Sequence, residues 1–137
     1  MKAIHNESVF YGALGVVRGG VLISYDIEPF ANFGQYATDS AFPHADSPLP
    51  LNLYYSWQGQ INDAYWRGIM QQSVDYLIEV AKSEGIWSAG MGTYPNYALS
   101  TYSGDRLYGN VNAARLRGIQ AQVDPMGVMS LAGGFTI

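Results

Sequence analysis

Alternating apolar and polar residues predict a strand over residues 21–28. One face of this strand carries its apolar side chains, which are Val21, Ile23, Tyr25 and Ile27. Residues 9–17 are also strand-like, and a turn at Arg18-Gly19-Gly20 separates the two stretches. Two such stretches on either side of a Gly-Gly turn are typical of a β-hairpin, which Pro29 would end. The sequence therefore predicts a hairpin at the start of the chain.

A third strand is predicted after a loop-like region at residues 31–48. The stretch LPLNLYYSW alternates. Its apolar residues form one row, namely Leu49, Leu51, Leu53, Tyr55 and Trp57. Residues 86–94 are predicted as a further strand that Gly90 and Gly92 weaken.

Helical periodicity predicts two helices. The first has a cap at Asn62 or Asp63 and ends before Gly85. Its inward face consists of Trp66, Ile69, Met70, Ser73, Leu77, Val80 and Ala81. The second runs from about Val111 to Gln122, and Asp124-Pro125 ends it. Its predicted inward residues are Leu116, Ile119 and Val123. The order of strands and helices predicts one α+β domain over residues 1–137, with helices packed on one face of an antiparallel sheet.

Composition narrows the classes of function. The chain has 137 residues, only 13% of them charged, and its seven Lys and Arg are scattered, so we expect no nucleic-acid partner. The absence of cysteine excludes disulfides, thiolate metal sites and a cysteine nucleophile. No stretch reaches the roughly 20 apolar residues that cross a bilayer, and the first residues lack the apolar core of a signal peptide. We therefore expect no membrane partner and a cytoplasmic location.

Aromatic residues make up 14% of the chain, including eleven Tyr. Tyr combines a flat apolar ring with a polar tip, which suits the wall of a pocket for a hydrophobic, oxygenated ligand. The alternative is that these rings simply fill a small core. Other chemistry lacks its motifs, because His5 and His44 are the only histidines and neither nucleotide-binding glycine spacing nor a nucleophile elbow is present.

The C-terminal third carries a series of short motifs. They are Tyr94-x-Asn96-Tyr97, Tyr108-Gly109-Asn110, Arg115-Leu116, and Asp124-Pro125 followed by Val128. Upstream, Phe42-Pro43-His44 precedes the predicted strand that ends at Trp57. In combination, over residues 10–137, these motifs resemble the C-terminal substrate-domain segment of berberine bridge enzyme-like FAD-linked oxidoreductases, with the fungal secondary-metabolism branch the most similar.

The resemblance implies roles for particular side chains. In that family the Tyr-x-Asn-Tyr turn faces the flavin and its second Tyr can act as a base. Carried over, Tyr97 is the candidate base and Asn96 a polar anchor. The alternative for Tyr97 is a core tyrosine that bonds a backbone carbonyl.

A pocket is expected between two parts of the chain. One is the sheet face that bears Asn52 and Tyr54, and the other is the loop that bears Tyr94, Asn96 and Tyr97. Tyr54 is a second catalytic candidate. The further candidates for substrate binding are His44 at the rim and Trp57, although His44 could instead only cap its turn.

Departures from the family pattern shape the predicted function. The FAD-binding domain of the family is absent before this segment, and the acid that many relatives carry on the strand after Phe-Pro-His is missing. We therefore expect no cofactor. The prediction is a stand-alone, flavin-independent cyclase or isomerase that acts on a hydrophobic, polyketide- or terpenoid-like natural-product intermediate. The alternatives are a split or non-catalytic subunit that completes an FAD-linked oxidase with a partner chain, or a ligand-binding protein.

The same departures predict an oligomer. A sheet without its neighbouring strands exposes unpaired edge groups and an apolar face. We therefore expect a homodimer or higher oligomer in which a second copy covers that surface.

Overall fold

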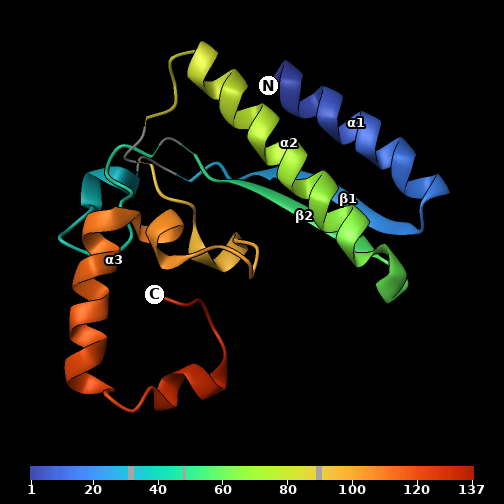
Figure 1. Ribbon diagram of the computed structural model, residues 1–137. Helices are drawn as coiled ribbons and strands as arrows, with labels where there is room; N and C mark the ends of the chain where they lie inside the picture. The colour runs from blue at the N-terminus through green and yellow to red at the C-terminus, as the bar shows by residue number, and fades with distance from the viewer. Residues whose placement is uncertain (31–32, 48, 89–90) are drawn as a thin grey trace. The chain divides into compact units, whose positions relative to one another are not determined.

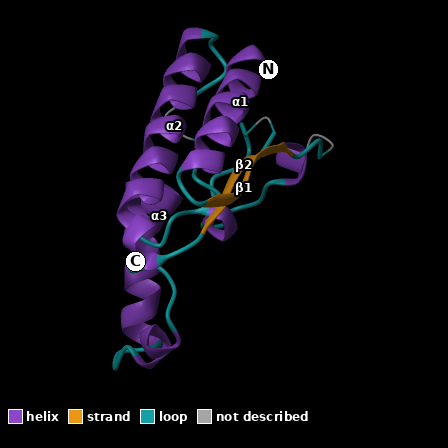
Figure 2. Ribbon diagram, turned by 90° about the vertical axis from the view of Figure 1, so that its right-hand side faces the viewer, coloured by secondary structure: helices purple, strands orange, loops and turns teal. Residues whose placement is uncertain are grey.

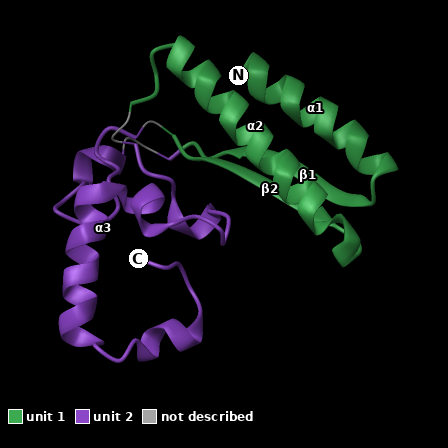
Figure 3. Cartoon of the chain, in the orientation of Figure 1, with its two compact units in different colours: residues 1–29, 49–88 green, residues 30–48, 89–137 purple. Residues whose placement is uncertain are grey.

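The computed structural model describes residues 1–30, 33–47, 49–88 and 91–137. In these residues it contains three α-helices and a two-stranded antiparallel sheet, which confirms the predicted α+β class. The chain divides into two compact units (Figure 3). Unit 1 comprises residues 1–29 and 49–88, and unit 2 comprises residues 30–48 and 89–137.

Unit 1 packs two helices on one face of the sheet. Its elements are α1 (Lys2–Val17), β1 (Gly20–Ile27), β2 (Leu51–Trp57) and α2 (Asp63–Ser83), with a short 3₁₀ helix, η2 (Gln60–Asn62), before α2. Both helices lie on the same side of the two strands (Figures 1 and 2). The predicted arrangement of helices on one face of an antiparallel sheet is thus confirmed for this unit.

The core of unit 1 is an aromatic cluster between the helices and the sheet. Tyr11 of α1, Tyr55 of β2 and Trp66 of α2 are buried together. Tyr55 packs its ring against Tyr11 at 6.2 Å and against Trp66 at 5.9 Å between centroids. The partly buried residues around them are Leu14, Ile23, Tyr25, Leu53, Trp57, Ile69 and Met70. The alternation of β2 therefore places its predicted apolar row toward the helices.

The predicted hairpin at the start of the chain is wrong. Residues 9–17 belong to α1, and β1 pairs instead with β2, so that Ile23 lies opposite Tyr55. The stretch VFYGALGVV resembles a strand because apolar residues lie on all sides of the helix. Val9, Phe10, Val16 and Val17 stay exposed, whereas Tyr11 and Gly15, four residues apart, are buried. Helical spacing on the buried side, and not overall hydrophobicity, decides the structure.

Two glycines allow α1 to turn closely into β1. A Cβ atom on Gly20 would lie 2.7 Å from the Cα atom of Gly15, which is closer than real Cβ contacts. Gly19, between the helix and the strand, has a φ angle of 70°, which favours glycine. The Gly-Gly turn recognised in the sequence therefore connects a helix to a strand.

A chain of hydrogen bonds links all four main elements of unit 1. Ser73 of α2 donates to the carboxylate of Glu7 on α1 at 2.6 Å, and its hydroxyl lies 2.7 Å from the hydroxyl of Tyr25 on β1. Tyr25 also bonds the hydroxyl of Tyr55 on β2. Burial raises the pKa of both Tyr25 and Tyr55 above the usual tyrosine value. These residues act as a polar centre inside an otherwise apolar core.

Helix α2 follows its prediction closely. The predicted inward residues are buried or half-buried, and Trp66, Ser73 and Leu77 are the most buried. Gly85 follows the helix with a φ angle of 69°. The N-cap residue is Asn62, one of the two predicted, but its side chain makes no capping hydrogen bond. The Asp63 carboxylate accepts the indole N–H of Trp57 at 2.8 Å.

Unit 2 is built from α3 (Gly104–Val123) and three short 3₁₀ helices, η1 (Phe33–Tyr36), η3 (Pro95–Tyr97) and η4 (Val128–Ala132).

The strand predicted over residues 86–94 is absent from 86–88 and 91–94, the part of it that the structure describes. There Gly92 donates one long backbone bond, 3.4 Å, to Pro43. A single such bond does not make a strand ladder.

Helix α3 begins earlier than predicted and is interrupted once. Its first residue is Gly104, capped by the hydroxyl of Ser103, and Gly109 breaks the helical geometry with φ 73° and ψ 156°. The segment after this break matches the predicted helix. Of the predicted inward residues, Leu116 is half-buried, whereas Ile119 and Val123 are exposed. That part of the prediction is wrong, because the buried residues of α3 are Gly104, Leu107 and Ala113 near its start.

Side chains of α3 hold the loop that precedes His44. Asn112 donates to the carbonyl oxygen of Ala41 at 2.9 Å, and Arg115 pairs with both carboxylate oxygens of Asp39 at 2.8 and 2.9 Å. At the start of α3, the backbone N–H of Gly104 donates to the carbonyl oxygen of Thr136. In the described chain, no helix has the length and apolar content to span a bilayer.

Candidate functional site

The loop of residues 33–47 in unit 2 carries His44. This loop folds back tightly, because a Cβ atom on Gly34 would lie 2.3 Å from the carbonyl oxygen of Ala45 and 3.0 Å from that of His44. Only glycine permits this approach without a shift of the backbone. The approach brings Phe33, the residue before Gly34, beside the His44 ring.

His44 is held in one orientation by a hydrogen bond and two aromatic rings. Its Nδ1 atom lies 2.8 Å from the carbonyl oxygen of Phe42. The imidazole stacks on Phe42 at 5.3 Å and 11° and on Phe33 at 5.7 Å and 9°. A carbonyl only accepts hydrogen bonds, so Nδ1 carries the proton. In the neutral form of the ring, Nε2 is then the acceptor, and no hydrogen bond from the described chain reaches it.

Helix η3 and the N-cap residue before it add two tyrosines, Tyr97 and Tyr94, beside these rings. Tyr94 lies 5.5 Å from Phe42 and 5.0 Å from Tyr97, with an edge-on geometry of 87° in the second pair. Asn96 donates to the Tyr94 hydroxyl at 2.7 Å, which leaves the proton of that hydroxyl able to donate. Tyr94 and Tyr97 remain 37% and 43% exposed. We call Phe33, Phe42, His44, Tyr94 and Tyr97 the aromatic cluster.

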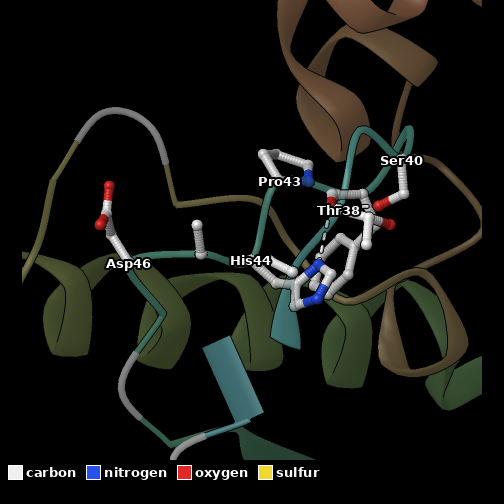
Figure 4. A pocket seen from close by; sticks show the side chains of 8 residues that line it. Thr38, Ser40, Pro43, His44 and Asp46 are labelled. Atoms are coloured by element: carbon white, nitrogen blue, oxygen red, sulfur yellow. Dashed lines mark hydrogen bonds between the residues drawn. The ribbon is translucent and has the colours of Figure 1, made fainter. Parts of the chain in front are cut away.

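A shallow hollow adjoins the aromatic cluster. It measures about 120 Å³ and shares Phe42 and His44 with the cluster (Figure 4). Its other lining residues are Ala37, Thr38, Ser40, Pro43, Ala45 and Asp46. Small-molecule pockets usually measure about 300–1,000 Å³, so this hollow can enclose a single ring or a polar end group. The rest of a larger ligand would have to lie on the exposed tyrosines.

The structure brings four of the seven predicted site residues together. His44, Tyr94, Asn96 and Tyr97 all belong to the aromatic cluster or bond directly to it. The other three lie in unit 1. Asn52 and Tyr54 occupy the sheet face away from the helices, opposite Asp26 and Ser24. Trp57 points to the helix side, where it stacks on Trp66 and donates its indole N–H to Asp63.

Sequence reasoning missed Phe33 as a partner of His44 and the whole polar centre of unit 1. Phe42 could be found from the Phe-Pro-His motif, whereas Phe33 is eleven residues from His44 and reaches it only through the close approach at Gly34. The polar centre consists of Glu7, Tyr25, Tyr55 and Ser73. The one sequence signal for it was the position of Ser73, a polar residue on the otherwise apolar face of α2. No group of three or more His, Asp or Glu in the described ranges could hold a metal ion.

Comparison with known proteins gives no further assignment. No protein-family model, curated protein or solved structure matches this chain. The resemblance to berberine bridge enzyme-like oxidoreductases stays a prediction from its short motifs.

Proposed function

We propose that unit 2 binds a flat, hydrophobic and oxygenated small molecule on the aromatic cluster. We propose further that this binding serves a cofactor-free cyclase or isomerase that acts on natural-product intermediates. The observation that carries the proposal is the setting of His44. Its ring is fixed between Phe33 and Phe42, its Nε2 atom is an open acceptor, and half-exposed tyrosines lie beside it.

The chemistry of the cluster selects the ligand class. Exposed ring faces favour a flat apolar partner, and each aromatic pair contributes about 0.5–1.5 kcal/mol beyond the area that it buries. A hydroxyl on the ligand could donate to Nε2 of His44. A carbonyl on the ligand could accept from the Tyr94 hydroxyl, whose oxygen is already bonded by Asn96. Such a site prefers an oxygenated ring system over a plain hydrocarbon.

The catalytic part of the proposal rests on Tyr97. Cyclisation and isomerisation need orientation and one or two hydrogen bonds to developing charge, without an oxidant or reductant. Tyr97 packs against Tyr94 at the edge of the cluster and is 43% exposed. It is therefore placed to share or transfer one proton with a ligand stacked there. The resemblance supplies this role for Tyr97, and the contacts of the cluster are compatible with it.

The small hollow favours a second candidate function. A space of about 120 Å³ provides one wall for a polycyclic substrate and does not enclose it. The remaining walls could come from another chain, as in a subunit that completes an FAD-linked oxidase. The visible spectrum of the purified protein separates the two candidates. A flavin absorption band would contradict the cofactor-free proposal and support the second candidate.

Titration with 2-naphthol, a flat phenol, tests the binding proposal. Phe33→Ala removes one ring that stacks on His44, and we expect its affinity for 2-naphthol to fall about tenfold. Tyr36→Ala is the matched control, because Tyr36 lies in the same η1 helix and is 76% exposed. Circular dichroism of each variant verifies folding. Absence of saturable binding to the native chain, or an equal loss in both variants, would overturn the proposal.

A further inference from the structure

Among the residues that the structure describes, strand β2 pairs with β1 along one edge and with no strand along its other edge. At both ends its backbone bonds toward the β1 side, because Glu28 N–H donates to Pro50 at 3.0 Å and Gln58 N–H donates to Gly19 at 2.9 Å. Backbone N–H and C=O groups alternate in direction along a strand, so those of the even-numbered residues of β2 point toward β1. The residues whose backbone groups point away from β1 are Leu51, Leu53, Tyr55 and Trp57. Within the described chain, no hydrogen bond reaches their backbone groups.

Strand β2 also lacks the features that protect a free edge. Proteins usually blunt such edges with charged residues, proline or bulges. The seven residues of β2, LNLYYSW, include neither a charged residue nor proline. In contrast, β1 carries Asp26 and the register irregularity between Gly20 and Leu22. Of the two strands, β2 therefore offers the edge that is open to pairing.

We propose that this edge pairs with β2 of a second copy of the chain. The result is a four-stranded antiparallel sheet around a two-fold axis. One register satisfies all four outward residues of each strand. It pairs Leu51 with the partner's Trp57 and Leu53 with the partner's Tyr55, and it places Tyr54 directly opposite the partner's Tyr54.

This register makes β2 complementary to itself. Tyr54 is 50% exposed on the sheet face away from the helices, and directly opposite aromatic residues are a favourable cross-strand pair. Strand β2 carries no charge that would repel the same strand of the second copy. On the helix side, the apolar row of β2 continues into the row of the partner. The dimer also gathers Asn52 and Tyr54 of both copies on one face, so each copy contributes predicted site residues to it.

The size of the interface sets the expected affinity. Seven residues at about 3.3 Å each give an edge of roughly 23 Å. Contact along so short an edge buries an area at the small end for a specific interface. We therefore expect a dissociation constant in the micromolar range. Sedimentation velocity from micromolar to several hundred micromolar protein should show a rise from the 15.0 kDa monomer to twice that mass.

One pair of variants distinguishes this interface from others. Tyr54→Lys puts two like charges directly opposite each other and should weaken the dimer at least about tenfold. Ser24→Lys is the matched control, because Ser24 lies opposite Tyr54 on the same sheet face but on β1. It should leave the dimer intact. A mixture of Tyr54→Lys and Tyr54→Glu chains should restore dimers through an opposite-charge pair.

Hydrogen exchange locates the contact independently. In the dimer, the amides of Leu53 and Tyr55 should be protected, whereas those of Ile23 and Tyr25 on the outer edge of β1 should still exchange. A monomer at every concentration, a dimer that survives Tyr54→Lys, or protection of the β1 edge instead would overturn the proposal. Assemblies larger than a dimer would also contradict it, because pairing through β2 alone closes after two copies.

Discussion

The Nδ1 atom of His44 lies 2.8 Å from the carbonyl oxygen of Phe42, two residues earlier in the chain. This bond fixes the tautomer of the neutral imidazole with the proton on Nδ1, because a carbonyl oxygen can only accept a hydrogen bond. Phe42 thus supports His44 twice, through its carbonyl oxygen and through its stacked ring. The consequence is an Nε2 acceptor with a fixed direction beside exposed aromatic surface. The proposed binding of a ligand by unit 2 rests on this arrangement.

We expect His44→Phe to remove selectivity for a hydroxyl while keeping an aromatic ring in the stack. The native chain should bind 2-naphthol more tightly than 2-methoxynaphthalene, because only 2-naphthol can donate to Nε2. One net hydrogen bond corresponds to about 0.5–1.5 kcal/mol, or about a two- to tenfold ratio of affinities. In His44→Phe the ratio should approach one. An unchanged ratio, measured by fluorescence titration of both compounds, would remove His44 from ligand recognition.

Tyr97→Phe should lower the rate of proton transfer with little effect on binding. The variant keeps the ring that packs on Tyr94 and deletes only the hydroxyl. Loss of one hydrogen bond to developing charge typically costs about 10²-fold or more in turnover. The assay is the exchange of the α-hydrogens of 2-tetralone, a flat ketone, in deuterated water, followed by NMR.

Asn96→Ala is the comparison for Tyr97→Phe. Asn96 bonds the Tyr94 hydroxyl at 2.7 Å, so its loss should mainly weaken binding and raise KM. Both variants are compared at equal folded fraction. If the native chain and Tyr97→Phe exchange the α-hydrogens of 2-tetralone at the same rate, Tyr97 has no part in the mechanism. Only the shape of the cluster would then account for any activity.

The polar centre of unit 1 should be costly to disrupt. Tyr25→Phe removes the hydroxyl that bonds both Ser73 and Tyr55, and it leaves the buried Tyr55 hydroxyl without this partner. A buried polar group without a partner costs about 1–3 kcal/mol in unfolding free energy. Tyr54→Phe is the control, because Tyr54 is half exposed on the opposite sheet face, and we expect less than about 0.5 kcal/mol there. Urea unfolding of both variants measures the difference, and equal losses would contradict the assigned role of Tyr25.

The same tyrosines predict how stability depends on alkaline pH. Burial raises the pKa of Tyr55 and Tyr25 in the folded chain, whereas tyrosines of the unfolded chain titrate near about pH 10. Above that pH the unfolded chain loses protons that the folded chain keeps. Their contribution to stability is therefore fully present below about pH 10 and is lost as the pH rises. Tyr55→Phe should flatten this fall in urea unfolding above pH 10, and an unchanged slope would contradict the prediction.

The sequence predicts those elements whose signals are local. Helix α2 is recognisable from its apolar stripe and from Gly85 at its end, and β2 from strict alternation up to Trp57. Helix α1 could not be recognised in the same way, because apolar residues surround it. Its helical state depends on the fit of Tyr11 against Tyr55 and of Gly15 against Gly20, which are contacts between distant or turn-connected residues.

The candidate site shows the same division. The Phe-Pro-His and Tyr-x-Asn-Tyr motifs supply His44, Tyr94, Asn96 and Tyr97, and the fold of unit 2 brings these four residues together. Phe33 was not predicted, because no local sequence pattern places it beside His44. The contact between Phe33 and His44 requires Gly34 to approach the backbone of Ala45. This approach is a property of the tertiary structure and has no local sequence pattern.

The most direct test of the binding proposal is to locate bound 2-naphthol by NMR. In a titration of ¹⁵N-labelled protein with 2-naphthol, the amide signals of Phe33, His44, Tyr94 and Tyr97 should shift in proportion to one another and reach saturation. Signals of unit 1 residues such as Trp66 and Ser73 should not move. Saturable shifts confined to unit 1, or no saturable shift at all, would contradict the assignment of the aromatic cluster as the ligand site.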